Sequence, residues 1–390
     1  MNGRRSNNRE AEAVARALGG FLKRSNPTTR LVLVGVLLLL LVGAAYLVWK
    51  QSQKPSGTEH ASGDWYELHF TSPEYPTNKA NYKGGLDTHL VRLIDKAKKT
   101  VDLADYDFDL QNVADALVAA KERGVQVRMV TDSETVENTK DEEIQAAFKK
   151  LRDAHIPIVE DRRSAIMHHK FTIVDGEWVQ TGSWNYTVND TYRHNNHLII
   201  IHSRELAENY TAEFEKMFVK KQFGAKKDKR VPYSVLTIGG AKVLTYFAPQ
   251  DRVAGHIIDT IQTARESIYF MAFSFTHDGI GKAILDKAKA GLKVGGVFET
   301  TGSKTKNSEY GKMEQAGLDV YTDGNPYSMH HKVIIIDERT VVFGSFNFSK
   351  NADESNDENV LIVEDANLAK AFKEEYDRIL AVAKNPPKKK

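Results

Sequence analysis

Two stretches of the sequence carry the same residue types at the same spacing. Residues 167–187 and 329–349 are identical at ten of 21 aligned positions. The shared positions of the first stretch that matter for chemistry are His168, Lys170, Asp175, Gly182, Ser183 and Asn185. Those of the second are His330, Lys332, Asp337, Gly344, Ser345 and Asn347. Imidazole is a nucleophile and a proton carrier, and ammonium, amide and hydroxyl groups bind anions, so both sets suit chemistry on an anionic substrate.

A phosphodiester is an anionic group that fits this set. Its charge repels a nucleophile, and two lysines offset that charge without a metal. A neutral imidazole attacks phosphorus to form a covalent intermediate, while a second, protonated imidazole donates to the leaving oxygen. An aspartate on the far ring nitrogen would hold such a histidine in one tautomer. The residues that we expect to bind the phosphate through amide or hydroxyl groups are Ser183, Asn185, Ser345 and Asn347.

The runs that follow each lysine predict how these side chains are aimed. FTIV and VIII are rich in β-branched residues, which favour a strand. Side chains alternate along a strand, so His168 and Lys170 share one face while His169 points to the other. The same holds for His330 and Lys332. A short turn and a second β-rich run then lead to Gly-Ser-x-Asn in both stretches.

The full pattern, H-x-K-x4-D-x6-G-S-x-N, resembles the HKD motif of the phospholipase D superfamily, and the resemblance spans about residues 65–384. The second copy continues GSFNFSKNADESNDENVLIV, which is similar to bacterial members of the Nuc-like branch. This resemblance implies a phosphodiesterase without a cofactor, in which one histidine becomes phosphohistidine and the other is the acid and base. We predict His168 as the nucleophile and His330 as the acid and base, although the pattern leaves the reverse assignment open. The other catalytic residues that the resemblance implies are Lys170, Lys332, Asp175, Asp337 and Glu358.

The two halves differ at one position after the motif. Glu358 lies 14 residues after Gly344, and Asn196 lies 14 residues after Gly182. If a glutamate at this position orients a histidine, the chain has one such glutamate rather than two. We therefore expect the two halves to have different roles.

Two metal sites are alternative interpretations. The His168–His169 and His330–His331 pairs suggest zinc, but strand neighbours face opposite sides, and the chain has no cysteine and no H-E-x-x-H pattern. Alternate carboxylates in DYDFDL would suit Mg²⁺ or Ca²⁺. These are Asp105, Asp107 and Asp109, where the second half has Ala272, Ser274 and Thr276. Because the second half lacks them, the shared chemistry does not need them, and we predict a site without metal.

Apolar runs of strand length alternate with helix-period segments such as 113–121 and 280–290, which predicts βαβ units. The expected fold class is α/β: a duplicated α-β-α sandwich of the phospholipase D type, with mixed sheets flanked by helices and two halves related by a pseudo-twofold axis. A chain with both motifs closes its own site, so a monomer suffices. The predicted divisions are a basic N-terminal segment (1–30), a transmembrane anchor (31–49), a linker (50–64), the first half (65–219), a basic linker (220–233), the second half (234–384) and a basic tail (385–390).

The anchor prediction rests on a run of 19 residues without a charge. As a helix this run would be about 28 Å long, close to the thickness of a bilayer's hydrocarbon core. Seven cations precede it, which predicts a cytoplasmic N-terminus and an extracytoplasmic catalytic part in a bacterial envelope. The expected localisation is therefore a single-pass membrane protein, with the lipid bilayer as a partner through residues 31–49.

Charge and motif leave three functions open. Residues 1–30 have a formal charge of +7 − 2 = +5. The whole chain has a net charge of +2, so the rest of the chain carries 2 − 5 = −3. A global basic surface for nucleic acid is therefore absent. The first hypothesis is nevertheless a Nuc-like nuclease acting on DNA or RNA. The alternative is a phospholipase D or cardiolipin-type hydrolase or phosphatidyltransferase that acts on a phospholipid headgroup. A non-catalytic scaffold is the third, and two complete motifs argue against it.

Overall fold

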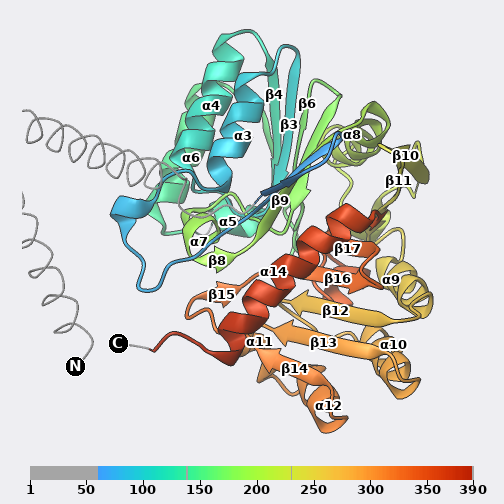
Figure 1. Ribbon diagram of the computed structural model, residues 1–390. Coiled ribbons are helices and arrows are strands. Elements are labelled where there is room, and N and C mark those ends of the chain that lie inside the picture. The colour runs from blue at the N-terminus through green and yellow to red at the C-terminus, as the bar shows by residue number, and fades with distance from the viewer. Residues whose placement is uncertain (1–59, 138, 230, 389–390) are drawn as a thin grey trace, which may run out of the picture. The chain divides into compact units, whose positions relative to one another are not determined.

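The computed structural model describes residues 60–137, 139–229 and 231–388 (Figure 1). These residues lie in one compact unit, Ser56–Lys390. The two halves predicted from the sequence fall inside this unit, and their boundaries stay a prediction.

The first sheet has eight strands in the order β1-β2-β9-β7-β6-β3-β4-β5. β3, β4 and β5 run parallel to one another, and the other neighbours are antiparallel. β6 contains the FTIV run, which was predicted to form a strand, and all five of its residues are buried. The strands are β1 (His60–Ser62), β2 (Tyr66–Phe70), β3 (Thr100–Asp105), β4 (Gln126–Thr131), β5 (Ile158–Glu160), β6 (Lys170–Val174), β7 (Trp178–Gly182) and β9 (His197–His202).

The second sheet repeats this plan in the order β10-β11-β18-β17-β16-β12-β13-β14, and again only β12, β13 and β14 are mutually parallel. The expected mixed sheets are thus confirmed, and the second VIII run lies in the fully buried β16. The strands are β10 (Val235–Ile238), β11 (Ala241–Ala248), β12 (Ser267–Ala272), β13 (Lys293–Phe298), β14 (Asp319–Thr322), β16 (Lys332–Ile336), β17 (Thr340–Gly344) and β18 (Glu358–Glu364).

Helices cover the sheets and build three apolar cores. α3, α4 and α6 pack on the outer face of the first sheet, and α9, α10 and α12 pack on the second (Figure 1). The third core joins the inner faces of both sheets with α8 and α14. The helices are α3 (Leu86–Asp95), α4 (Gln111–Glu122), α5 (Ser133–Glu137), α6 (Glu142–Asp153), α7 (Val188–Tyr192), α8 (Arg204–Phe218), α9 (Val253–Gln262), α10 (Asp278–Lys289), α11 (Thr300–Ser303), α12 (Tyr310–Gln315), α13 (Lys350–Glu354) and α14 (Ala366–Lys384), with short 3₁₀ turns at Lys79–Asn81 and Gly224–Lys226.

A two-stranded parallel ladder links the two sheets at the site. β8 (His194–Asn195) pairs with β15 (Ser328–Met329). An isolated bridge from Met167 to Asp357 occupies the corresponding place on the other side. Each motif therefore enters its sheet directly after a contact with the opposite half.

The basic segment 220–233 is less solvated than predicted, because three of its described residues are buried: Phe223, Gly224 and Lys227. Lys227 is 4% exposed, and its ammonium contacts the carboxylates of Glu213 and Asp357. Attraction to these carboxylates outweighs burial and raises the pKa of Lys227. This cation is therefore part of the folded frame rather than of a patch open to an anionic ligand.

The predicted localisation is corrected. The proposed anchor, 31–49, lies outside the described residues. Among the residues that the structure describes, no helix is both long and apolar enough to cross a bilayer. α14, at 19 residues, is the longest helix of this part, and charged residues recur along it. Such charges are costly in hydrocarbon, so the structure gives no support to a single-pass membrane protein.

Candidate active site

The two motifs meet in one place, held by backbone bonds between the halves. The N–H of His168 donates to the carbonyl of Asp357 at 2.9 Å, and the N–H of His330 donates to the carbonyl of Asn195 at 2.9 Å. Both histidines are buried, at 5% and 7% exposure. Each motif is thus fixed by the segment that follows the other motif.

The motif lysines point to the same place as the histidines, as strand alternation predicted. Lys170 Nζ donates to the carbonyl of His168 at 2.9 Å, and Lys332 Nζ donates to that of His330 at 2.7 Å. Burial lowers the pKa of both histidines well below its usual value, and the charges of both lysines lower it further. Because each lysine acts on the histidine of the opposite half as well as on its own, all four side chains belong to one centre.

The far ring nitrogens of the two histidines have different partners. Nδ1 of His168 lies 2.8 Å from Oε2 of Glu358, so the ring donates to a carboxylate. Nδ1 of His330 lies 3.0 Å from Oδ1 of Asn196, so this ring donates to a neutral amide. Burial raises the pKa of Glu358 to about 7, against the lowering effect of Lys170. The predicted role of Glu358 as the partner of a histidine agrees with this geometry, and the histidine belongs to the first motif.

The motif serines lie behind these partners, not beside the predicted substrate. Ser345 Oγ donates to Glu358 at 2.6 Å, and Ser183 Oγ donates to the Asn196 oxygen at 2.9 Å. Both serines are 0% exposed. The prediction that they bind phosphate is therefore not supported, because their hydroxyls are directed to the residues that orient the histidines.

The motif asparagines keep a free acceptor. The side-chain oxygens of Asn185 and Asn347 are buried and have no hydrogen-bond partner among the described residues. Asn185 precedes α7, and its backbone N–H donates to Asp190 at 2.8 Å. Of the predicted phosphate-binding set, these two amides remain available to a ligand: their free oxygens accept from a hydroxyl, and only their N–H groups can donate to a phosphate oxygen.

The motif aspartates are not near the histidines, which corrects their predicted catalytic role. Asp175 accepts the backbone N–H groups of Lys98, Lys99 and Thr100 at 2.7–3.2 Å. Asp337 makes the same contacts, at 2.8–3.2 Å, to the three residues that lead into β12: Arg265, Glu266 and Ser267. Each aspartate sits in the turn between two motif strands and ties it to the start of the neighbouring strand. Their function in the fold is to hold the sheet.

The motif glycines are required by a close strand contact. Gly182 and Gly344 both have φ of 150°, in the region that favours glycine. A Cβ on Gly182 would lie 2.3 Å from the carbonyl oxygen of His197, and one on Gly344 would lie 2.2 Å from that of Asn359. These contacts set β7 against β9 and β17 against β18, and so place Asn196 and Glu358 beside the motif strands.

His169 and His331 point away from the site, as predicted. His169 is 0% exposed and lies 3.5 Å from a carboxylate oxygen of Glu213 on α8. His331 is also 0% exposed and lies 2.9 Å from Glu375 on α14. They join the sheets to the central helices.

The alternative metal sites are not assembled among the described residues. One group of three ligand-type side chains within reach of a single ion is found there, Glu67, His69 and His89, and it contains no motif histidine. Asp105 accepts the N–H of Tyr186, and Asp109 accepts that of Val188. Their carboxylates therefore fix the segment after the first motif.

Sequence reasoning missed Asp190. This residue on α7 is 3% exposed, and its Oδ2 lies 3.5 Å from Nδ1 of His330. The second half has Ala352 at the corresponding position, so a comparison that keeps only shared residues discards Asp190. The sequence did offer one indication: Asp190 is an acidic residue without a counterpart in the second half, and it lies in the half where Asn196 replaces the glutamate.

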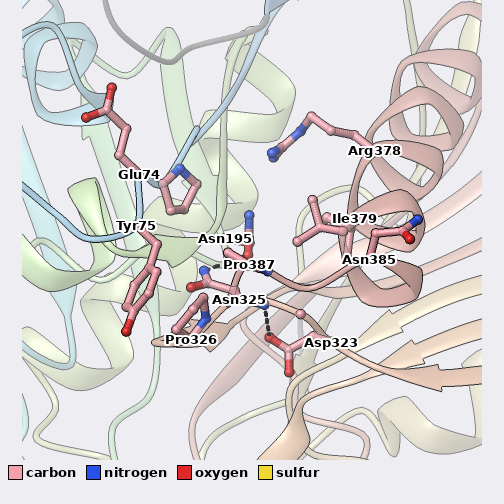
Figure 2. Close-up of a pocket in the computed structure, with 13 residues that line it drawn as sticks. Glu74, Tyr75, Asn195, Asp323, Asn325, Pro326, Arg378, Ile379, Asn385 and Pro387 are labelled. Carbon is pink, nitrogen blue, oxygen red and sulfur yellow. Dashed lines mark hydrogen bonds between the residues drawn. The ribbon is translucent and has the colours of Figure 1, made fainter. Parts of the chain in front are cut away.

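A pocket of about 340 Å³ adjoins the site on the side of His330 (Figure 2). Asn195, whose carbonyl accepts the N–H of His330, is one of its lining residues. Tyr75 and Pro326 face it from two loops, and Arg378 and Ile379 face it from α14. None of the motif histidines or lysines lines it, so this pocket is a neighbour of the site and not the site itself.

The sequence matches the family described as cardiolipin synthase, PLD-like domain, over residues 90–218 and 257–380. Phospholipase D of Rickettsia bellii is 38% identical over 140 residues, which are 36% of this chain and 70% of that protein. The mitochondrial cardiolipin hydrolase of Homo sapiens is 33% identical over 123 residues, 32% of this chain and 49% of that protein.

Two solved structures are similar. Phosphatidylserine synthase of Haemophilus influenzae Rd KW20 has a TM-score of 0.61 and 12% identity, covering 85% of this chain and 90% of its own. Nuc from Salmonella typhimurium has 33% identity and a TM-score of 0.34, covering 36% of this chain and 95% of its own. The synthase shares the fold over most of the chain, and both matched segments of the family contain one motif each.

Proposed function

The chain belongs to the family described as cardiolipin synthase, PLD-like domain, and is a phosphoric diester hydrolase; we propose that it works through a covalent phosphohistidine on His168. One observation carries this proposal. His168 Nδ1 donates to the Glu358 carboxylate at 2.8 Å, which leaves Nε2 as the ring atom with a lone pair. Lys170 and Lys332, close enough to lower the pKa of this histidine, supply the positive charge that an attacked phosphodiester needs.

The reaction has two displacements. In the first, Nε2 of His168 forms a bond to phosphorus, the bond to the leaving oxygen breaks, and His330 gives that oxygen a proton. In the second, water attacks phosphorus, its proton passes to His330, and the electron pair of the phosphorus–nitrogen bond returns to His168. The lysine ammonium groups and the amide N–H groups of Asn185 and Asn347 donate to the non-bridging oxygens in both steps.

The charge state of the two histidines fits this order of steps. Burial and the lysines keep both histidines largely neutral before substrate binds, as their low pKa values show. A bound phosphodiester offsets the lysine charges, so the pKa of His330 rises on binding and a proton becomes available for the leaving group.

We place phospholipid headgroup diesters first among the substrates. Two relatives named above, 38% and 33% identical to this chain, are called phospholipase D and mitochondrial cardiolipin hydrolase. Residues 31–390 carry a formal charge of −3, which gives little support to binding a long polyanion. Nucleic acid is the second candidate, supported by the likeness of 344–359 to the Nuc-like branch. The pocket beside His330 offers space for the part of either substrate beyond the phosphate.

A single experiment separates these substrates. The purified full chain, in EDTA, is given vesicles of phosphatidylcholine, phosphatidylglycerol and cardiolipin, and in parallel single-stranded DNA and RNA. We expect release of lipid headgroup or diacylglycerol phosphate, and none from the His168→Ala variant. Cleavage of nucleic acid alone would overturn the lipid assignment. Loss of all activity in EDTA, with recovery on adding a divalent cation, would overturn the two-histidine mechanism.

A further inference from the structure

His330 lacks the carboxylate that His168 has. Glu358, the partner of His168, is replaced in the first half by Asn196, whose amide oxygen accepts from His330 Nδ1 at 3.0 Å. An amide orients the ring but brings no negative charge. His330 is faced by the cations Lys332 and Lys170 and by the ring of His194, and burial adds to their effect. An acid in such surroundings holds its proton poorly.

Asp190, on α7, brings a negative charge close to His330. Its Oδ2 lies 3.5 Å from His330 Nδ1, beside the amide of Asn196. Asp190 lies on α7 six residues before Asn196, and the second half has the fully buried Ala352 on α13 instead. The two halves therefore each hold one carboxylate near the opposite histidine, at different sequence positions.

The carboxylate of Asp190 is held on both oxygens. The backbone N–H of Asn185 donates to Oδ2 at 2.8 Å, and the ring of His194 contacts Oδ1. Asn196 Nδ2 donates to the Asp190 carbonyl at 3.1 Å, so the amide and the acid form one unit. Burial raises the pKa of Asp190, but attraction to His330 and the bonds from His194 and Asn185 outweigh it, and the carboxylate stays charged.

We propose that Asp190 is the positioning residue that supplies the counter-charge of protonated His330, replacing the glutamate that the first half lacks at Asn196. This inference rests on the proposed function, because it assumes that His330 delivers a proton to the leaving oxygen. Asp190 acts through His330 and does not touch the phosphate.

The chain itself supplies the design of the test. Asp190→Ala places alanine where the second half has Ala352, and it removes the carboxylate that lies 3.5 Å from His330. Adding Asn196→Glu rebuilds the arrangement of the second half. The control Asp153→Asn removes an exposed carboxylate on α6 that pairs with Lys149. All variants are made in the full chain.

The first readout is the dependence on the leaving group. A general acid matters for an alkoxide, which needs a proton to leave, and hardly for 4-nitrophenolate. We expect Asp190→Ala to lower kcat on the alkyl diester that the wild type hydrolyses by about 10²-fold, and on bis(4-nitrophenyl) phosphate by less than about fivefold. The double variant should regain most of the loss, and Asp153→Asn should match the wild type. An equal loss on both substrates, or no recovery in the double variant, would show a merely structural role and overturn the proposal.

The second readout does not need turnover. The ring of His330 is titrated by NMR in histidine-labelled protein, with a His330→Gln variant to assign the signal. Removal of an opposite charge at this distance should lower the pKa of His330 by at least about 1, and the double variant should restore it. An unchanged pKa in Asp190→Ala overturns the proposal even if the wild type is active. A wild type inactive on every diester, together with the expected pKa change, would instead contradict the proposed function and leave the coupling of Asp190 to His330 standing.

Discussion

The two halves hold their histidines in the same backbone frame but with different chemistry around the ring. His168 and His330 lie two residues before the equivalent strands β6 and β16, and both backbone N–H groups bond to the opposite half. Beyond that, His168 donates to the carboxylate of Glu358, whereas His330 donates to the amide of Asn196 with Asp190 at 3.5 Å. The repeat thus gives the two histidines equivalent backbone positions, and single residue differences around their rings give them different chemical roles.

The lysines show a second difference between the halves. Lys170 pairs across the sheet with Asp105, and Lys332 pairs with Ala272. Burial lowers the pKa of both lysines, and the attraction of Asp105 limits the effect on Lys170, while the pKa of Lys332 lies well below its usual value. The first half therefore has a carboxyl group behind its cation, and burial raises the pKa of that carboxyl well above its usual value although Lys170 lowers it. A phosphodiester would gain more by binding to Lys332, which has less internal compensation.

The largest expected effect separates the two histidines. His168→Ala removes the nucleophile, so turnover on every diester should fall by about 10⁴-fold or more. His330→Ala removes only the acid and base, so it should still form a covalent adduct from bis(4-nitrophenyl) phosphate and then accumulate it, because the second step lacks a base. Mass spectrometry of protein denatured and digested at alkaline pH, where the phosphorus–nitrogen bond survives, measures the adduct and its position. An adduct on His330 in the His168→Ala protein would reverse the assignment.

A smaller effect concerns pH and the carboxylate of Glu358. Its pKa of about 7 means that the group is charged above this pH and protonated below it. The charged form supports His168 as it attacks, and bound substrate raises the pKa of His330 so that it keeps its proton; kcat should therefore rise as the pH increases to about 7 and then level. Glu358→Gln should abolish this rise and lower the plateau by about 10²-fold. The control is Glu364→Gln, at the exposed far end of the same strand and paired with Lys242. A Glu358→Gln profile with the wild-type shape would assign the titration to another group.

What the sequence predicted well was the frame. The apolar runs 171–174 and 333–336, and the helix-period segments 113–121 and 280–290, lie in β6, β16, α4 and α10. The repeat also placed His168 and Lys170 on one face correctly, because alternation along a strand is a local property. Where the backbone between two residues is a regular strand or helix, their spacing in the sequence predicts their relative positions in the structure.

What the sequence did not predict was the direction of contacts between segments. Ser183 was expected to bind the phosphate and Asp175 to be catalytic, yet both hold other parts of the fold in place. Asp190 and the buried Lys227 have partners far along the chain or in the other half, and no local pattern announces such contacts. Residues that recur in both motifs are those that both halves need. Residues present in one half, such as Asp190, make the chemistry of the two halves different.

The smallest expected effect on activity tests this distinction between frame and chemistry. Asp175→Asn keeps one acceptor for the N–H groups of residues 98–100 but loses the charge that strengthens those bonds. Asp337→Asn makes the same change in the second half. Each should lower the free energy of unfolding by about 1–2 kcal/mol in urea titrations and leave kcat on the preferred diester within about twofold. Since the contacts are alike, the two losses should agree within about 0.5 kcal/mol and add in the double variant. A fall in kcat of about 100-fold at unchanged stability would return these aspartates to the catalytic role that their recurrence first suggested.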